Sequence, residues 1–552
     1  MQNYPSTPPS SFSIAHYLYE SKKLEEAITI CHSILQTDPN DFDTLCLLSL
    51  ALSEQGDLNQ ALTTCEKAIH INPNTAPIFS HQAQILQRLN LYEEALQSYS
   101  QALNIDPYFS SARCNRGLLM HSLQRYHEAL EDFEQILQYE TNSAIAWANK
   151  GNTLFALNHF KDALHSYNQA LALQPNYYKA LANKGYILNK LGKKQEALQT
   201  FKKAWEIHPN LAESNFHLAC ALRNTHQHIQ ALDFYEHARA LGFDESTLQY
   251  HESLCLLALE NFTLAWEKFE KRWDVPELKL THNSLNLPRW NINIPLKGKT
   301  ILIESEQGYG DIIQFARYLT PLKELGAHII FAVPNILSTL MSKLPYIDKI
   351  LLAGDAVPHI DYTCPLLSLP FTLQTTNHIP NTVPYIINNP HLIKQWGEKL
   401  KPRQKIRVGI VWSASHRGVD RSIPLALWSI LQILSIEWHT LQKEISKDDY
   451  SLLEKYSHIH IWAEELTDFA QTAALIHHMD LIISVDTAVA HLSGALGKPT
   501  WILIPYDNDW RWGDSKQESL WYPTARLFRQ KDDWENVINE VNINLKEYCN
   551  LS

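Results

Sequence analysis

The sequence predicts two fold classes in one chain: an all-α solenoid of helical repeats, followed by a pair of Rossmann-like α/β halves. Alanine and proline each recur every 34 residues through the first part of the chain, and from Thr300 onward apolar runs of strand length alternate with helical patterns. The chain of 552 residues also exceeds the roughly 250 to 300 residues at which a single hydrophobic core stops growing. At least two domains are therefore expected.

Composition and charge narrow the class of protein. Hydrophobic residues make up 45% and charged residues 19%, and 59 acidic residues against 47 Lys and Arg leave a net charge of -12. This balance predicts a folded, soluble chain and argues against nucleic acid as a partner, because a phosphate backbone requires a concentrated basic surface. The eight cysteines form no C-x-x-C pair, and neither an export leader nor a membrane-length apolar run is found. We expect a cytoplasmic protein with reduced thiols and no transmembrane segment.

The repeats are defined by three series in one register. An alanine and a second small residue indicate close helix packing within each unit, and a proline marks the boundary between units. The series are Ala27, Ala61, Ala95, Ala129, Ala163, Ala197, Ala231 and Ala265; Ser49, Ala83, Gly117, Gly151, Gly185, Ala219 and Ser253; and Pro39, Pro73, Pro107, Thr141, Pro175 and Pro209. They predict about eight helix-turn-helix units over residues 12–275. The units resemble the tetratricopeptide (TPR) repeat, which implies a solenoid whose groove binds a protein partner.

A polar series follows the same interval. Asn115, Asn149 and Asn183 recur on the first helix of successive units. Their amides are candidate partner-binding groups, because an amide can both donate to and accept from a peptide backbone. The TPR array of protein O-GlcNAc transferases, which this architecture resembles, looks to hold its protein substrates in this way. The alternative is that asparagine is an ordinary packing residue at this repeat position.

The second part divides into two α/β halves. Strands are expected at residues 300–304, 328–333 and 349–352 in a first half over residues 297–398, and at 406–412, 438–441, 459–462, 481–485 and 500–504 in a second half over residues 406–530. A C-terminal helix is expected over residues 532–547. Two such halves facing a crevice are the arrangement called GT-B, in which ligands lie beyond the carboxyl ends of the strands. The candidate site residues should therefore follow the strands.

The loop after the first strand carries a candidate catalytic acid. Gly308 and Gly310 permit a tight turn, and Asp311 then lies at the start of a helix. The carboxylate is a candidate general base that removes a proton from an acceptor hydroxyl. The alternative is a helix cap, since aspartate commonly satisfies the free amides of a first helical turn.

Two loops of the second half are candidates for diphosphate binding. The first runs from Ser413 through Arg417 to Arg421 and combines hydroxyls, backbone amides and guanidinium groups, which suit phosphate oxygens. The second leaves a buried strand at Asp486, Thr487 and Ala488, where the free amides of a helix start can hold phosphate, and His491 follows one turn later. We assign both loops to the donor side of the site.

The segment from Val485 to Leu492 resembles the D-[ST]-[GA]-x-x-H-[LI] motif of glycosyltransferase family nine, the ADP-heptose:lipopolysaccharide heptosyltransferases, and the loop from Gly310 to Ile313 resembles their G-D-[VI]-[LI] motif. The resemblance implies roles for matching residues: Asp311 as catalytic base, Thr487, Ala488 and His491 as donor-diphosphate contacts, and Arg421, where lysine is usual, as a basic phosphate contact. It implies no metal or other cofactor. Asp507-Asn508-Asp509 has the D-x-D form of a metal-nucleotide site, but we interpret it as loop polarity or as acceptors for sugar hydroxyls.

These observations predict a glycosyltransferase of hexosyl or heptosyl type. It would move a sugar from a nucleotide-diphosphate donor to a hydroxyl of a protein or glycan acceptor, with inversion and without a metal, while the repeats recruit the acceptor or a partner protein. Two alternatives stay open. One is a non-catalytic TPR scaffold with a degenerate nucleotide-sugar-binding domain, and the other is a protein O-glycosyltransferase similar to O-GlcNAc transferases.

Overall fold

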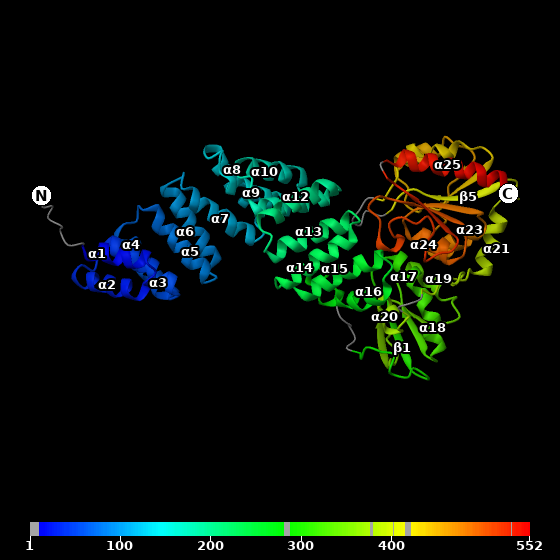
Figure 1. Ribbon diagram of the computed structural model, residues 1–552, viewed down its shortest axis with the longest axis horizontal. Coiled ribbons are helices and arrows are strands. Elements are labelled where there is room, and N and C mark those ends of the chain that lie inside the picture. The colour runs from blue at the N-terminus through cyan, green and yellow to red at the C-terminus, as the bar shows by residue number, and fades with distance from the viewer. Residues whose placement is uncertain are drawn as a thin grey trace. The chain divides into compact units, whose positions relative to one another are not determined.

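The computed structural model describes residues 10–280, 287–375, 379–400, 402–414, 421–531 and 533–551. Its contacts divide the chain into two compact units, Met1–His208 and Pro209–Ser552, which are coloured along the chain in Figure 1. Within the described residues, no helix combines the length and the apolar character needed to cross a membrane.

The first unit consists of helices that follow one another in antiparallel pairs (Figure 1). They are α1 (Ser11–Glu20), α2 (Leu24–Thr37), α3 (Phe42–Gln55), α4 (Leu58–Ile71), α5 (Ala76–Arg88), α6 (Tyr92–Ile105), α7 (Ser110–Ser122), α8 (Tyr126–Tyr139), α9 (Ala144–Ala156), α10 (Phe160–Leu173), α11 (Tyr178–Lys190) and α12 (Lys194–Ile207). All eight alanines of the 34-residue series, two of which lie in the second unit, are fully buried. The predicted all-α repeat solenoid is confirmed.

Small residues on the first helix of a pair leave space for an aromatic ring on the second. A Cβ added at Gly185 would lie 2.5 Å from Phe201, and one at Gly151 would lie 2.9 Å from Tyr167. These separations are shorter than any normal carbon contact, so the glycines set the distance between the two helices. The turn inside each pair has its own signature, a left-handed backbone at the same repeat position: Lys22, Gly56, Asn90, Gln124, Asn158, Gly192, His226 and Glu260.

The second unit begins with two further helix pairs, α13 (Ala212–Asn224), α14 (His228–Ala240), α15 (Glu245–Ala258) and α16 (Phe262–Phe269). Trp266 of α16 is buried and packs edge-on against Phe315 of the α/β region, with ring centroids 5.9 Å apart. Helices α15 and α16 therefore share a hydrophobic core with the first sheet. The boundary between the compact units differs from the end of the repeat pattern, because the last helix pair buries its apolar residues against the first sheet.

The first sheet is parallel, with strand order β3-β2-β1-β4. Its strands are β1 (Thr300–Glu304), β2 (His328–Ala332), β3 (Lys349–Leu351) and β4 (Tyr362–Pro365), and its helices are α17 (Tyr309–Phe315), α18 (Leu319–Glu324), α19 (Asn335–Met341) and α20 (Leu369–Thr372). Strand β1 is central, so the loop that follows it opens at the middle of the sheet edge.

The second sheet is also parallel, with strand order β10-β9-β8-β5-β6-β7. Its strands are β5 (Ile406–Val411), β6 (Ile436–Thr440), β7 (Ile459–His460), β8 (Leu481–Val485), β9 (Thr500–Ile504) and β10 (Ala525–Arg529), and its helices are α22 (Lys447–Leu453), α23 (Phe469–His477), α24 (Ala488–Ala495) and α25 (Trp534–Leu551). Helix α25 packs against β10, where Arg526 Nη1 donates to Asn544 Oδ1 at 2.7 Å, and its buried residues join the core on that face of the sheet. Strands β4 and β10 were not predicted.

The chain passes from one half to the other around Tyr385, whose hydroxyl donates to the Ile313 carbonyl of the first half at 3.2 Å. The Tyr385 amide donates to the Ala495 carbonyl of α24 at 3.1 Å, and α21 (Pro390–Lys399) packs on α23, where Trp396 Nε1 donates to Gln471 Oε1 at 2.9 Å. The predicted first half, residues 297–398, thus differs from the structure. The reason is that the apolar face of α21, centred on buried Trp396, is covered by the second half.

Candidate functional site

The loops that follow β1, β5 and β8 meet around a cavity of about 230 Å³. Three predicted donor-binding residues line it: Ser413, Thr487 and Ala488. The other lining residues are Tyr309, Ile336, Val411, Ala414, Leu441, Gln442, Lys443, Glu444, Leu466, Asp468, Phe469, Thr472 and Val489. The cavity combines apolar walls with a few polar groups, which is typical of a small-molecule site.

Helix α24 begins at this cavity. Thr487 is its N-cap residue, with an extended backbone, and its side-chain oxygen lies 3.1 Å from Ser484 Oγ. Because the first amides of a helix have no acceptor inside the helix, the N–H groups of Ala488 and Val489 are available to a ligand. The positive end of the helix dipole adds to their attraction for an anion.

A buried ion pair lies beside this helix start. Arg421 Nη1 donates to Asp486 Oδ2 at 2.8 Å, and the Asp486 side chain is only 3% exposed. Burial raises the pKa of the Asp486 carboxyl above its usual value, although Arg421 opposes that shift. The structure therefore brings two predicted donor-side residues together, but as partners of one another.

Asp311 is held by two contacts. Its Oδ2 accepts from the Gly308 amide at 2.8 Å, the reciprocal contact of a capping box in α17. Its Oδ1 accepts a hydrogen bond from Arg511 Nη2. One carboxylate oxygen of Asp311 thus caps the helix, as one of the two interpretations predicted. The other oxygen is paired with an arginine.

Arg511 was not predicted from the sequence. Its guanidinium is 7% exposed, and it also contacts Asp509 Oδ1 at 2.7 Å and Gln314 Oε1 at 2.7 Å. Burial alone would lower its pKa, but Asp509 and Asp311 raise that pKa above the usual value. The only sequence signal was its place in the tryptophan-rich loop after β9, where Asp509 was interpreted as loop polarity.

His491 lies behind the loop of Gly310. A Cβ at Gly310 would lie 2.8 Å from His491 Cδ2, so the glycine permits α17 to approach α24. His491 Nδ1 lies 2.8 Å from the Tyr522 hydroxyl, and the ring stacks on Trp512 with centroids 5.1 Å apart. Burial, reinforced by nearby arginines, lowers the pKa of His491 well below its usual value, so the imidazole is uncharged at neutral pH.

The predicted site residues therefore form two adjoining groups. Ser413, Thr487 and Ala488 line the cavity, whereas Asp311, Arg421, Asp486 and His491 do not. The adjacent residues Asp486 and Thr487 join the two groups. The Ser413 amide donates to Gln442 Oε1 at 3.2 Å, while Arg417 falls within residues 415–420, outside the described part of the chain.

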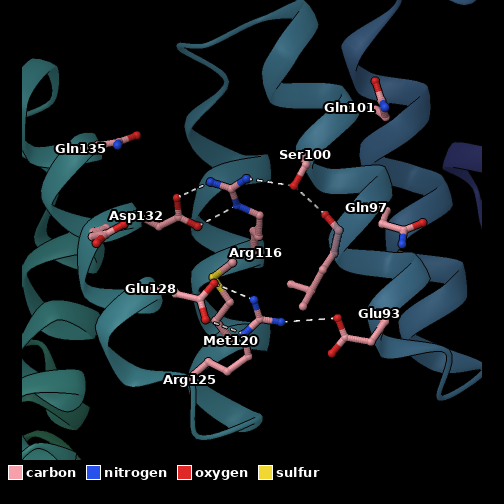
Figure 2. A pocket seen from close by; sticks show the side chains of 12 residues that line it. Glu93, Gln97, Ser100, Gln101, Arg116, Met120, Arg125, Glu128, Asp132 and Gln135 are labelled. Carbon is pink, nitrogen blue, oxygen red and sulfur yellow. Dashed lines mark hydrogen bonds and ion pairs between the residues drawn. The ribbon is translucent and has the colours of Figure 1, made fainter.

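A separate groove of about 490 Å³ lies in the first unit, over α6, α7 and α8. Figure 2 shows Arg116 on the middle helix reaching both neighbours: it donates to Asp132 Oδ1 at 2.6 Å and to Ser100 Oγ at 3.0 Å. Arg125 likewise pairs with Glu128 at 2.6 Å and with Glu93 at 3.4 Å (Figure 2). The groove lining holds four carboxylates, of Glu93, Glu128, Glu131 and Asp132, against the guanidinium groups of Arg116 and Arg125.

The predicted asparagine series does not line this groove. Asn149 is buried and its amide contacts Cys114 Sγ at 3.6 Å, whereas Asn183 donates to Asn152 Oδ1 at 2.7 Å. Asn115 is half-buried on α7. Two of these amides are thus engaged inside the unit, and their role toward a partner stays a prediction.

Several segments match described protein families. Residues 148–212 match "Tetratricopeptide repeat", residues 84–124 match "TPR repeat", and residues 7–102 match "Anaphase-promoting complex, cyclosome, subunit 3". Residues 463–517 match "Glycosyltransferase family 9 (heptosyltransferase)". The repeats are therefore TPR repeats. The glycosyltransferase match is partial: it contains Asp486, Thr487, Ala488 and His491 but begins after Asp311, Ser413 and Arg421.

Relatives and solved structures resemble parts of the chain. "Protein FlbA" of Caulobacter vibrioides is 25% identical over 338 residues, which are 55% of this chain and 56% of FlbA, so this chain spans about half of that relative. A tetratricopeptide repeat protein from Parabacteroides merdae is 18% identical, covering 45% of this chain and all of its own, with a TM-score of 0.37. YrrB, described as a TPR protein with an unusual peptide-binding site, is 25% identical, covering 34% of this chain and 98% of its own, with a TM-score of 0.30.

Proposed function

We propose that this chain is a glycosyltransferase with a protein-binding TPR solenoid: the α/β part binds a nucleotide-diphosphate sugar and transfers the sugar to an acceptor hydroxyl. The observation that carries the proposal is the cavity at the start of α24, where backbone amides, the Thr487 hydroxyl and the Ser413 side chain surround a space of about 230 Å³. The partial family match over residues 463–517 supports the same assignment.

The diphosphate would be bound mainly by uncharged donors. The amides of Ala488 and Val489 and the Thr487 hydroxyl lie at the positive end of α24. Lys443 is the one lysine among the cavity residues and supplies a positive charge there. Charge that grows on the departing diphosphate would be stabilised by these fixed dipoles and by Lys443.

In this proposal Asp311 acts as the general base. Oδ2 stays fixed by the Gly308 amide, while the acceptor hydroxyl replaces Arg511 at Oδ1 and gives its proton to the carboxylate. Arg511 keeps Asp509 and Gln314 as partners when it moves aside. The acceptor oxygen then attacks the anomeric carbon as the bond to the diphosphate breaks, which inverts that carbon.

The second candidate function is a scaffold without transferase activity. It is favoured by a specific observation: Asp311 is paired with Arg511, and Arg421 with Asp486. Charges neutralised inside the chain are less available to a substrate. The same cavity would then sense a nucleotide sugar, and the TPR solenoid would hold a protein partner.

The binding step is tested by removing a single backbone amide. Ala488→Pro deletes the N–H at the first position of α24, where proline is tolerated, and the extended Thr487 suits a following proline. In titration calorimetry with a panel of nucleotide-diphosphate sugars, we expect the wild type to bind one of them and Ala488→Pro to bind it at least about 10-fold more weakly, the loss of one charge-assisted hydrogen bond.

Ala212→Pro is the matched control, because it makes the same change at the first position of α13, outside the cavity. It should leave the affinity unchanged. Equal affinity in Ala488→Pro and the wild type would show that the amide at the start of α24 does not bind the nucleotide sugar. A chain that binds its nucleotide sugar but transfers no sugar to water or to any acceptor tested would favour the scaffold.

A further inference from the structure

A cluster of metal-ligating side chains lies apart from the cavity, where the turn between α13 and α14 meets the loop after β9. His226 Nδ1 lies 2.8 Å from Asp514 Oδ1, and His228 Nε2 lies 3.1 Å from Asp514 Oδ2. All three groups can present one ligand atom within 4.8 Å of the other two. They border a cavity of about 180 Å³.

The tautomer of His226 follows from its other neighbour. Nε2 lies 2.7 Å from the Tyr506 carbonyl, which can only accept, so Nε2 carries the proton. In the uncharged ring the lone pair of Nδ1 then faces Asp514 Oδ1, and two lone pairs at 2.8 Å repel unless a cation or a proton lies between them. A ring nitrogen that donates to a carbonyl while its partner binds a metal is the usual arrangement of a histidine ligand.

His228 is 7% exposed, yet neither of its ring nitrogens makes a hydrogen bond within the described residues. Although Nε2 lies 3.1 Å from Asp514, the alignment of the two groups is not that of a hydrogen bond. A buried polar atom without a partner costs about 1–3 kcal/mol. A bound cation would satisfy it.

The repeat register strengthens this reading of His228. The same position in the other seven units holds Leu24, Leu58, Tyr92, Tyr126, Phe160, Lys194 and Phe262. Six of these are apolar or aromatic, so packing alone would favour a large apolar residue. His228, two residues from His226 and facing Asp514, is instead a residue type that can bind a metal ion.

We propose that His226, His228 and Asp514 bind a divalent transition-metal ion, with Zn²⁺ as the ion to test. Two imidazoles and a carboxylate suit Zn²⁺, and its bonds of about 2.0–2.1 Å place tetrahedral ligand atoms about 3.3 Å apart. The two histidine nitrogens lie 2.8 and 3.1 Å from the Asp514 oxygens, and all three groups can bring a ligand atom within 4.8 Å of the others. Arg529 donates to the Gly513 and Lys516 carbonyls at 2.9 and 3.0 Å and holds the loop around Asp514. The ion would fasten the helical repeats to the loop that carries Asp509 and Arg511, without taking part in transfer.

A second group, Glu437, His439 and His460, has a similar composition but does not fit a metal. Trp462 Nε1 donates to His439 Nδ1 at 3.0 Å, which uses the ring's lone pair and leaves the proton of the uncharged ring on Nε2. Nε2 lies 3.3 Å from Glu437 without a hydrogen bond, as in His228, but it has no lone pair to offer a metal. The Arg407 guanidinium also pairs with Glu437 at 3.2 Å. This group therefore provides a control.

The test uses the full-length chain without an affinity tag, stripped by a chelator and then titrated with Zn²⁺ or Co²⁺. His228→Phe and His226→Asn introduce residues that other repeats carry at the same positions, as in Phe262 and Asn90, so both variants should fold. We expect the wild type to bind one more Zn²⁺ than His228→Phe, and to show the visible absorption of tetrahedral Co²⁺, which His228→Phe lacks. Affinity should fall at least 10-fold in His226→Asn and Asp514→Asn.

His460→Gln should keep the wild-type stoichiometry. Equal stoichiometry in the wild type and a folded His228→Phe variant would overturn the proposal, as would a wild type that binds no Zn²⁺ at micromolar concentration. Metal binding is measured here without any nucleotide sugar, so its outcome is independent of the proposed transferase activity.

Discussion

At the scale of single residues, Asp311 has two geometrically distinct contacts. The Gly308 amide fixes one oxygen of the carboxylate as part of a helix cap, and Arg511 occupies the other. An asparagine in this place still offers one oxygen to the Gly308 amide but cannot take a proton at neutral pH. Asp311→Asn therefore separates the cap from the base.

We expect Asp311→Asn to lower turnover by about 100-fold or more, which is the scale of general-base catalysis. The affinity for the donor should stay within about twofold, because Asp311 does not line the cavity. Transfer assays and calorimetry on the same preparation provide both values. Asp509→Asn is the control, since it also removes one carboxylate from Arg511. If Asp311→Asn turns over at the wild-type rate, Asp311 is not the general base. Equal losses of turnover in Asp311→Asn and Asp509→Asn would assign the effect to Arg511.

At the scale of elements, the distance between the helices of a pair depends on one small residue. The Cβ of an alanine at 185 would lie 2.5 Å from Phe201, whereas one at 117 would lie 2.9 Å from Phe133. Each change also gains the higher helix propensity of alanine, about 1 kcal/mol. The two effects oppose one another, so the tighter position should show the larger net loss.

We expect Gly185→Ala to lower the free energy of unfolding by about 1–3 kcal/mol, the usual cost of overpacking, and Gly117→Ala to lower it by less. Thermal unfolding followed by the helical circular dichroism signal compares the two variants. Phe201→Leu should restore part of the loss when combined with Gly185→Ala, because the two residues share one contact. Equal melting temperatures for the wild type and Gly185→Ala would show that the clash with Phe201 costs no more than the roughly 1 kcal/mol that alanine gains in helix propensity.

At the scale of the whole molecule, the compact units and the repeats do not coincide. The repeat pattern extends to residue 275, but the helices after Pro209 belong to the compact unit of the two sheets. Trp266 and Phe269 are 1% and 2% exposed within the core that contains Phe315 and Trp521. A fragment that ends after these helices would expose them.

We expect residues 1–208 to form a soluble, almost wholly helical fragment, because each repeat depends on its neighbours alone. Residues 1–280 should instead bind a hydrophobic dye and self-associate, since burying a large apolar side chain contributes about 1.5–3 kcal/mol that the fragment cannot recover. Circular dichroism and size-exclusion chromatography compare the two fragments, and residues 209–552 serve as the control for an intact core. If the 1–280 fragment is monomeric and binds no dye, the first folding unit ends at the end of the repeats and not at residue 208.

By itself, the sequence determined the elements whose signals are local. The 34-residue alanine, proline and small-residue series predicted the solenoid, because helix pairing inside a repeat depends on residues that are close in the chain, and the apolar runs predicted most strands. It missed β4, which is short and ends in Pro365, and β10, where Arg526 and Arg529 interrupt the apolar pattern. Both strands are defined by pairing with neighbours rather than by composition.

Only the tertiary structure decided which charges meet. Arg511 reaches Asp311 from 200 residues away in the chain, and Asp514 lies 288 residues beyond its partner His226. No periodicity reports such contacts, because they depend on how the loop after β9 packs against α17 and against the last repeats. The start of a helix after a buried strand is a local feature, so the sequence indicated Thr487 and Ala488 correctly. The pairing of Arg421 with Asp486 joins distant segments, so the sequence could not show it.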